Sequence, residues 1–327
     1  MIGNIIIDVK LARTFASNFF DSLYNTDISS SRADSEFWRQ AEESAIILKN
    51  RGRLSEELIS RISYGFYGTI KSCFKPIHCE KKRNGAMVTQ YGIYLHSIRT
   101  SREANNRVLG FTSFCITVGK REIDIILREL PVNLTFHLVE RFSLRENIGG
   151  NRLDTALKHN LLELSKKIIF ILPTFKNKTF PITLPFGDGL ILGAVNGGNN
   201  ISFGYRRTYT NRFADYNAEI DDYIFRKKNH PQSGVKFITY IDYSSCAPEQ
   251  DSIAEWERNF FLIHSDFINS YWCDSLFTKR GFDFRSHLHK YESIVRDFVS
   301  HANHKDYYNV IQRYGARALG MVEIKRE

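Results

Sequence analysis

Apolar residues recur at helical intervals through the first 80 residues of the chain. One set predicts a helix that begins near Ala33 and ends at Asn50-Arg51-Gly52: Phe37, Ala41, Ala45 and Leu48. A second set predicts another helix that begins at Ser55-Glu56-Glu57: Leu58, Ile59, Ile62 and Phe66. The charged segment from Cys79 to Gly85 is expected to be a turn that ends an N-terminal helical region, residues 1–80.

Segments rich in β-branched and aromatic residues characterise the central region, residues 86–245. Val88–Ile98 and Val108–Val118 predict a hairpin with a long loop, and a strand is expected at Ile123–Arg128. Helices are expected at about 135–146 and 152–166. Four short apolar runs separated by turn residues then predict an antiparallel meander: 168–172, 180–184, 190–195 and 201–210. A helix at 212–225 and a strand at 235–243 complete this region.

The helical pattern returns at Asp251 and predicts helices at 253–277, 284–301 and 307–319. The predicted fold class is therefore α+β. A central antiparallel β-meander with helices packed on it, in a central α+β domain (86–245), is flanked by an N-terminal helical region (1–80) and a C-terminal helical region (251–327).

The chain of 327 residues is basic, since 45 Lys and Arg oppose 36 Asp and Glu, which gives a formal net charge of +9. An excess of positive charge favours contact with polyanions such as nucleic acids. Neither a signal peptide nor an apolar run of about 20 residues is visible, so we expect a cytoplasmic protein with no membrane partner. Five cysteines at irregular spacing indicate reduced thiols. P-loop, dinucleotide-binding and serine-hydrolase motifs are absent, and we expect no cofactor and no metal site.

The predicted helix at 135–146 carries a polar stripe. His137, Arg141 and Arg145 are spaced four apart and therefore share one helix face. An imidazole that exchanges a proton near neutral pH, beside two permanent cations, suits chemistry at a phosphate. His137 would move the proton and the arginines would neutralise developing charge. The alternative is a histidine at the edge of the core beside two solvated arginines.

A second basic segment is the strand that contains Tyr205, Arg206, Arg207 and Tyr209. Strand alternation puts Tyr205, Arg207 and Tyr209 on one face and Arg206 on the other. Tyrosines can stack on bases while arginines hold phosphate, so Tyr205, Arg206 and Tyr209 are candidates for nucleic-acid binding, together with Arg145. Alternatively, an edge strand carries such charges only to resist aggregation.

The order of strand, H-x-x-x-R-x-x-x-R helix, second helix and β-meander over residues 123–212 resembles bacterial toxin-type domains related to the RelE and BrnT ribonucleases. The resemblance implies that His137, Arg141 and Arg207 are catalytic. The chain differs from such toxins because it is far longer and has helical regions on both sides. This difference favours a sensor or regulator built around the domain.

A rival candidate lies near the C-terminus. The segment from Arg296 to His301 resembles the R-x4-6-H motif of the HEPN ribonucleases, in which the arginine and histidine attack RNA. Arg296 and His301 are therefore the alternative catalytic pair.

These observations lead to one functional hypothesis and one alternative. We expect a nucleic-acid-acting protein, a metal-independent RNase-like or defence- and toxin-related factor of a bacterium or mobile element, with RNA or single-stranded DNA as its partner. The alternative is a non-catalytic module that binds nucleic acid, a protein partner or a second copy of itself.

Overall fold

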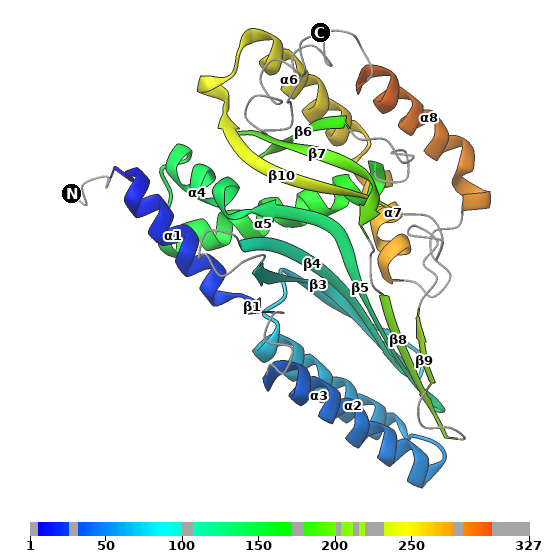
Figure 1. Cartoon of the computed structure of the whole chain (residues 1–327). Helices are drawn as coiled ribbons and strands as arrows, with labels where there is room; N and C mark the ends of the chain where they lie inside the picture. The colour runs from blue at the N-terminus through cyan, green and yellow to red at the C-terminus, as the bar shows by residue number, and fades with distance from the viewer. Residues whose placement is uncertain are drawn as a thin grey trace.

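The computed structural model describes residues 6–25, 32–99, 107–171, 180–200, 204–211, 216–219, 232–277 and 284–302. Its centre is a mixed sheet of ten strands (Figure 1). The strands are β1 (Tyr24–Asn25), β2 (His78–Asn84), β3 (Met87–Arg99), β4 (Arg107–Val118), β5 (Glu122–Thr135), β6 (Phe180–Phe186), β7 (Gly189–Asn200), β8 (Gly204–Thr210), β9 (Tyr216–Glu219) and β10 (Gln232–Asp242). The helices are α1 (Val9–Ser22), α2 (Arg32–Arg51), α3 (Glu56–Cys73), α4 (Phe136–Arg145), α5 (Gly150–Ile171), α6 (Pro248–Ile263), α7 (Ser265–Phe277) and α8 (Phe284–Ala302).

The sheet branches at β5. Its main path runs β1-β3-β4-β5-β10-β7-β6, and β2 pairs with the same edge of β3 as β1. On the edge of β5 that faces away from β4, the first part of β5 pairs with β8, and Ile125 lies opposite Arg207. Strand β8 in turn pairs with β9. The last part of β5 pairs with β10 in parallel, where Val132 faces Val235. The two branches diverge from β5 toward opposite ends of the molecule (Figure 1).

The long strand β5 continues past Arg128, where the predicted strand ends, and through Pro131. Proline cannot donate a ladder hydrogen bond and is tolerated in strands at irregularities. The pairing of β4 with β5 shifts register at this place, between Leu109 and Phe111, which face Leu134 and Leu130. The bulge therefore accommodates Pro131 within β5, so that this one strand pairs with both branches of the sheet.

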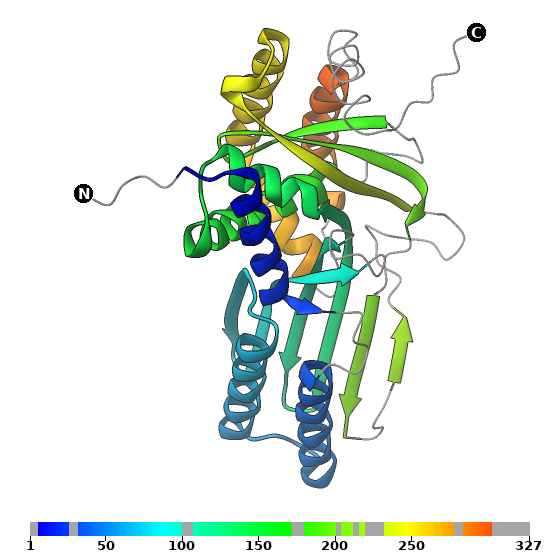
Figure 2. The ribbon, with the colours of Figure 1, turned by 60° about the vertical axis from the view of Figure 1, so that its left-hand side comes forward.

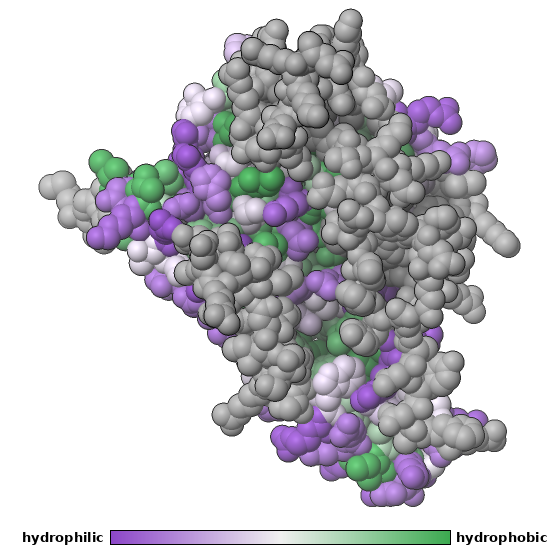
Figure 3. All heavy atoms as spheres, in the orientation of Figure 1, coloured by the Kyte–Doolittle hydropathy of each residue, from purple (hydrophilic) through white to green (hydrophobic). Residues whose placement is uncertain are grey.

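One face of the sheet is covered by the helical hairpin of α2 and α3. Ser55 caps α3 by accepting a hydrogen bond from the Leu58 amide, and Gly52 has a positive φ of 66° after α2. The hairpin and the sheet share a core that includes Phe37, Phe66, Phe114, Ile125 and Tyr209. Hydrophilic side chains predominate where this end of the molecule is visible in Figure 3.

A second, larger core joins the remaining helices to the sheet. Phe20 of α1 packs on Phe136 of α4 at 5.5 Å between ring centroids, and Phe170 of α5 packs on Tyr271 of α7 at 5.6 Å. Each of the three regions predicted from the sequence contributes to this core, the N-terminal region through α1. In Figure 2, as in Figure 1, α6 and α8 lie at the opposite end from the α2–α3 hairpin.

Buried Arg128 closes the last turn of α7. Its Nη1 donates to the carbonyl oxygens of Ser275 at 3.0 Å and Leu276 at 2.8 Å. A cation that satisfies the terminal carbonyls of a helix is favourable there, because those groups have no partner within the helix. Arg128 therefore ties α7 to β5. No helix in the described part of the chain is both long and apolar enough to cross a membrane.

The α+β fold class is confirmed, and so are the hairpin of β3 and β4, helix α8 and strand β10. The segment Cys79–Gly85 was predicted wrongly, because it forms most of β2, whose residues pair with β3 from His78 to Asn84. Its charged side chains are those of an edge strand rather than of a turn.

The expected meander is also corrected. Residues 168–171 form the end of α5 instead of a strand, since a short buried apolar run fits either element. Strand β8 does not pair with β7 but returns to β5. Residues 216–219, expected to be helical, form β9. The predicted helix 253–277 is two helices that meet at His264, and the predicted helix 307–319 lies outside the described residues.

Candidate functional site

Helix α4 presents the polar stripe that its spacing predicts. His137 and Arg141 project from one face, with Nε of Arg141 3.4 Å from Nε2 of His137. The Nδ1 atom of His137 lies 3.3 Å from a carboxylate oxygen of Glu140. The His137 side chain is 48% exposed, so the imidazole is open to solvent and not buried under the apolar face of the helix.

Carboxylates gather at the C-terminal end of the same helix. Arg145 donates to Asp242 at 3.1 Å, so its charge is paired within the protein. Glu146, the residue after α4, accepts a hydrogen bond from the hydroxyl of Tyr240. Burial raises the pKa of Glu146 to about 7, and the charges of Asp188 and Asp242 add to this shift. No sequence pattern selects Glu146, because its neighbours come from β10 and from the turn after β6.

The arginines of β8 are bound within the protein. Arg206 pairs with the buried carboxylate of Asp124 through Nε at 2.9 Å and Nη2 at 3.2 Å. The guanidinium carbon of Arg207 lies 4.9 Å from the ring centroid of Trp38, and its Nη1 lies 3.1 Å from the Tyr209 hydroxyl. Tyr209 is only 2% exposed and belongs to the core under α2. Its ring has no open face on which a base could stack.

The structure does not bring the three proposed catalytic residues together. Arg207 faces Ile125 in the first half of β5, whereas His137 and Arg141 follow the last residue of that strand. Ten residues of extended strand separate the two places, which corresponds to about 30 Å. Figure 1 shows β8 and α4 near opposite ends of β5. The structure describes the backbone of Tyr205 but not its side chain.

The C-terminal pair lies on α8. Arg296 is exposed, and the ring of His301 stacks on Trp256 with 3.5 Å between centroids and an interplanar angle of 11°. This packing occupies one face of the imidazole. Within the ranges that the structure describes, no group of three or more His, Cys, Asp or Glu side chains is arranged to hold a metal ion.

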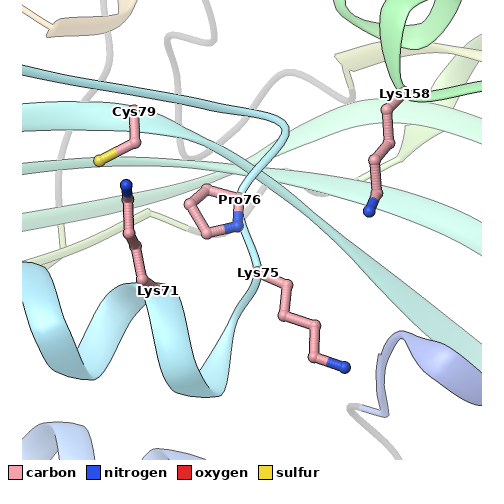
Figure 4. A pocket seen from close by; sticks show the side chains of 5 residues that line it. All are labelled: Lys71, Lys75, Pro76, Cys79 and Lys158. Carbon is pink, nitrogen blue, oxygen red and sulfur yellow. The ribbon is translucent and has the colours of Figure 1, made fainter. Parts of the chain in front are cut away.

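One cavity in the described part of the chain is lined by three lysines. It has a volume of about 340 Å³ and is lined by Lys71, Lys75, Pro76, Cys79 and Lys158. These residues come from the end of α3, the connection to β2, β2 itself and α5. In Figure 4, Lys71 points toward Cys79, while Lys75 and Lys158 both extend into the space beside Pro76. None of the residues that line the pocket is acidic.

The charges in this pocket are only partly neutralised. Lys158 pairs with Asp154 at 2.7 Å, but Lys71 and Lys75 form no ion pair with any residue that the structure describes. A hydrogen bond to Tyr67 raises the pKa of Lys71, so this amine remains a cation. Burial raises the pKa of the Cys79 thiol, which therefore stays neutral and adds no negative charge.

Two tyrosines continue the pocket along α3. Tyr64, Tyr67 and Lys71 lie three and four residues apart, so they share one helix face. The Nζ atom of Lys71 lies 4.4 Å from the ring centroid of Tyr67, and Tyr64 is 73% exposed. We call Tyr64, Tyr67, Lys71, Lys75 and Lys158 the lysine–tyrosine surface.

The neighbouring strand β2 extends the positive charge beyond the pocket. Lys81 lies on the same face of β2 as Cys79, and Lys82 lies on the opposite face with its Nζ 5.0 Å from the Tyr91 ring centroid. Neither lysine forms an ion pair with the described residues. Five lysines are thus gathered around the β2 edge of the sheet: Lys71, Lys75, Lys81, Lys82 and Lys158.

Backbone strain also occurs at the pocket. Lys75 has a φ of 44°, in the left-handed region that costs a residue with a Cβ atom about 1 kcal/mol. Such strain persists only where the surrounding structure imposes it, and it concentrates at functional sites.

The sequence contained one signal of the lysine–tyrosine surface, the helical spacing of Tyr64, Tyr67 and Lys71, but nothing that placed Lys158 beside them. A scan against protein-family models, a search of curated proteins and a search of solved structures each found no match to this chain.

Proposed function

We propose that the protein binds single-stranded RNA or DNA, without cleaving it, through the lysine–tyrosine surface. The observation that carries this proposal is the pocket of three lysines without an acidic lining residue, beside an exposed tyrosine. The free thiols of all five cysteines and the absence of a membrane-spanning helix among the described residues support action in the cytoplasm.

The chemistry of the surface suits this partner. Lysine ammonium groups attract phosphates as point charges, and counterions released from the nucleic acid drive association. An exposed tyrosine ring offers a face for a base, and such stacking contributes about 1–3 kcal/mol per base without a strong sequence preference. Bases are available for stacking in single strands, so single-stranded nucleic acid is favoured over a duplex as the partner.

A charge-matched comparison tests the location of the binding site. The triple variant Lys71→Gln, Lys75→Gln, Lys158→Gln removes the pocket charges. The control variant Lys10→Gln, Lys49→Gln, Lys120→Gln removes three exposed lysines elsewhere, so both variants lower the net charge of +9 by three.

We expect the affinity for a fluorescent single-stranded oligonucleotide to fall in the pocket variant and to change little in the control. The slope of log affinity against log salt should lessen by about 2 in the pocket variant, since each lost phosphate contact contributes about 0.7 for single strands. Equal losses in both variants would show that only net charge matters, and would refute the proposed surface.

The tyrosine contribution is tested separately. Tyr64→Ala should weaken binding roughly tenfold, which corresponds to about 1.4 kcal/mol of stacking, whereas Tyr64→Phe retains the ring and should bind as the parent does. If both substitutions leave the affinity unchanged, the surface binds phosphate alone.

A second candidate function, ribonuclease activity on α4, is favoured by one observation. Exposed His137 lies within 3.4 Å of Arg141, which is the arrangement of a proton-transfer group beside a cation. If this pair acts in catalysis, His137→Ala should lower RNA cleavage by about 10²–10⁴-fold with little change in RNA affinity. If the variant cleaves RNA at the parental rate, binding without cleavage is the better explanation of the protein's function.

A further inference from the structure

A second cavity lies between α5, α6 and α7, distinct from the lysine-lined pocket. It has a volume of about 240 Å³. Its charged lining consists of Glu163, Lys166 and Lys167 from α5 and Arg258 from α6, while Phe261 supplies part of an apolar wall. The cavity is smaller than common ligand pockets of about 300–1,000 Å³, so it suits a compact molecule.

The two adjacent lysines have different surroundings. The Nζ atom of Lys166 donates to Glu163 at 2.6 Å, an ion pair that stabilises its ammonium form. The Nζ atom of Lys167 donates to the carbonyl oxygen of Pro185 at 3.1 Å and lies 5.3 Å from the ring centroid of Phe261. No carboxylate in the described part of the chain forms an ion pair with Lys167.

The environment of Lys167 disfavours its charged form relative to that of an exposed lysine. Burial lowers the pKa of Lys167, and the charge of Arg258 lowers it further, whereas Glu163 and Glu257 oppose the shift. Each unit by which a lysine pKa falls raises the neutral fraction at pH 7.4 about tenfold. A lysine desolvated in a partly apolar cavity beside another cation is the known arrangement of a nucleophilic lysine.

Arg258 supplies the complementary feature. Its guanidinium carbon lies 3.8 Å from the ring centroid of Tyr243, and it forms no ion pair with the described carboxylates. A guanidinium without a carboxylate partner can form a bidentate contact with the carboxylate of a ligand. The cavity therefore combines an amine nucleophile with an anchor for a negatively charged group.

We propose that Lys167 forms an imine with a small aldehyde or ketone that carries a carboxylate. The lone pair of Nζ attacks the carbonyl carbon, and the electron pair of the C=O bond moves to oxygen, which takes up a proton to give a carbinolamine. Loss of water then forms the C=N bond. One amine and one carbonyl compound thus yield one imine and one water, and no oxidant or reductant takes part.

Reductive trapping tests this proposal on the full chain. The protein is incubated with 4-carboxybenzaldehyde and cyanoborohydride at pH 7.4, and the labelling of each lysine is followed by peptide mass spectrometry. We expect Lys167 to be labelled faster than Lys166, with a rate that saturates as the aldehyde concentration rises. Neutral benzaldehyde should label it more slowly, because it lacks the group that Arg258 holds.

The adjacent lysine provides the matched control. Lys167→Arg should remove the dominant label, and Lys166→Arg should retain it. Because the main comparison is made between two lysines of the parental protein, it stands even if a variant fails to fold. Labelling of Lys167 that is no faster than that of exposed Lys49, or that rises linearly with aldehyde concentration, would overturn the proposal.

Discussion

The buried carboxylate of Asp124 offers a direct test of what holds β8 on the sheet. Asp124 is 1% exposed and accepts hydrogen bonds from two nitrogens of Arg206, at 2.9 and 3.2 Å, and from the hydroxyl of Thr208 at 2.6 Å. Both donors come from β8. Asp124→Ala removes all three interactions and leaves a cation without its partner.

The size of the effect follows from how far Arg206 is buried. Removal of one partner from a buried ion pair costs about 3–5 kcal/mol, mainly because the other charge remains desolvated. The side chain of Arg206 is 37% exposed and can turn toward water, which places this pair at the low end of that range. We expect Asp124→Ala to lower the free energy of unfolding by about 3 kcal/mol.

Urea unfolding measures this change, and a double-mutant cycle with Arg206→Ala isolates the coupling between the two residues. The matched control is the exposed pair of Arg39 and Glu43, whose side chains are 68% and 54% exposed. Glu43→Ala should cost less than about 0.5 kcal/mol. A similar cost for both substitutions would refute the argument that burial decides the strength of these pairs.

The same cycle separates structure from binding. If Arg206 acts only as a partner of Asp124, Arg206→Ala should lower stability and leave the salt dependence of nucleic-acid binding unchanged. A loss of affinity comparable to that of the lysine triple variant would instead return Arg206 to the binding surface, as the sequence suggested.

Three further predictions concern pH and backbone packing. The folded-state pKa of Glu146, about 7, lies above its ordinary value. The stability that protonated Glu146 contributes at pH 5 should therefore be lost as pH rises toward 8. Urea unfolding at both pH values measures this loss, and Glu146→Gln should remove it. At Gly92 a Cβ atom would lie 2.0 Å from the carbonyl oxygen of His78, so Gly92→Ala should separate β2 from β3 and weaken both stability and oligonucleotide binding. Gly68→Ala, where nothing lies within 4 Å, should instead stabilise α3 by up to about 1 kcal/mol, and a destabilising effect there would contradict the open environment.

The sequence predicted the elements whose signal is local. The spacing of Phe37, Ala41 and Leu48 identified α2, and the long β-branched runs identified β3 and β4. The errors arose where local pattern is ambiguous. Ile168–Ile171 are buried at the end of a helix, and the charged residues of β2 resemble a turn until their pairing with β3 is known.

The candidate site of α4 and β8 failed to assemble for a different reason. Strand alternation correctly placed Arg207 and Tyr209 on the same face, but the sequence could not show which element covers that face. The partner of Arg206 is Asp124, 82 positions away in the chain. Topology decides such pairings, and β8 returns to β5 instead of following β7.

The gathering of lysines illustrates why net charge alone did not point to the lysine–tyrosine surface. Charges act together on a ligand only when they lie within about a Debye length, roughly 8 Å at physiological salt. Lys75 and Lys158 meet in one pocket because α5 packs beside the connection between α3 and β2. That proximity depends on the core beneath them, so it has no counterpart in the spacing of basic residues along the chain. The charge-matched lysine variants therefore test the three-dimensional arrangement itself, because they keep the composition equal and change only the place from which charge is removed.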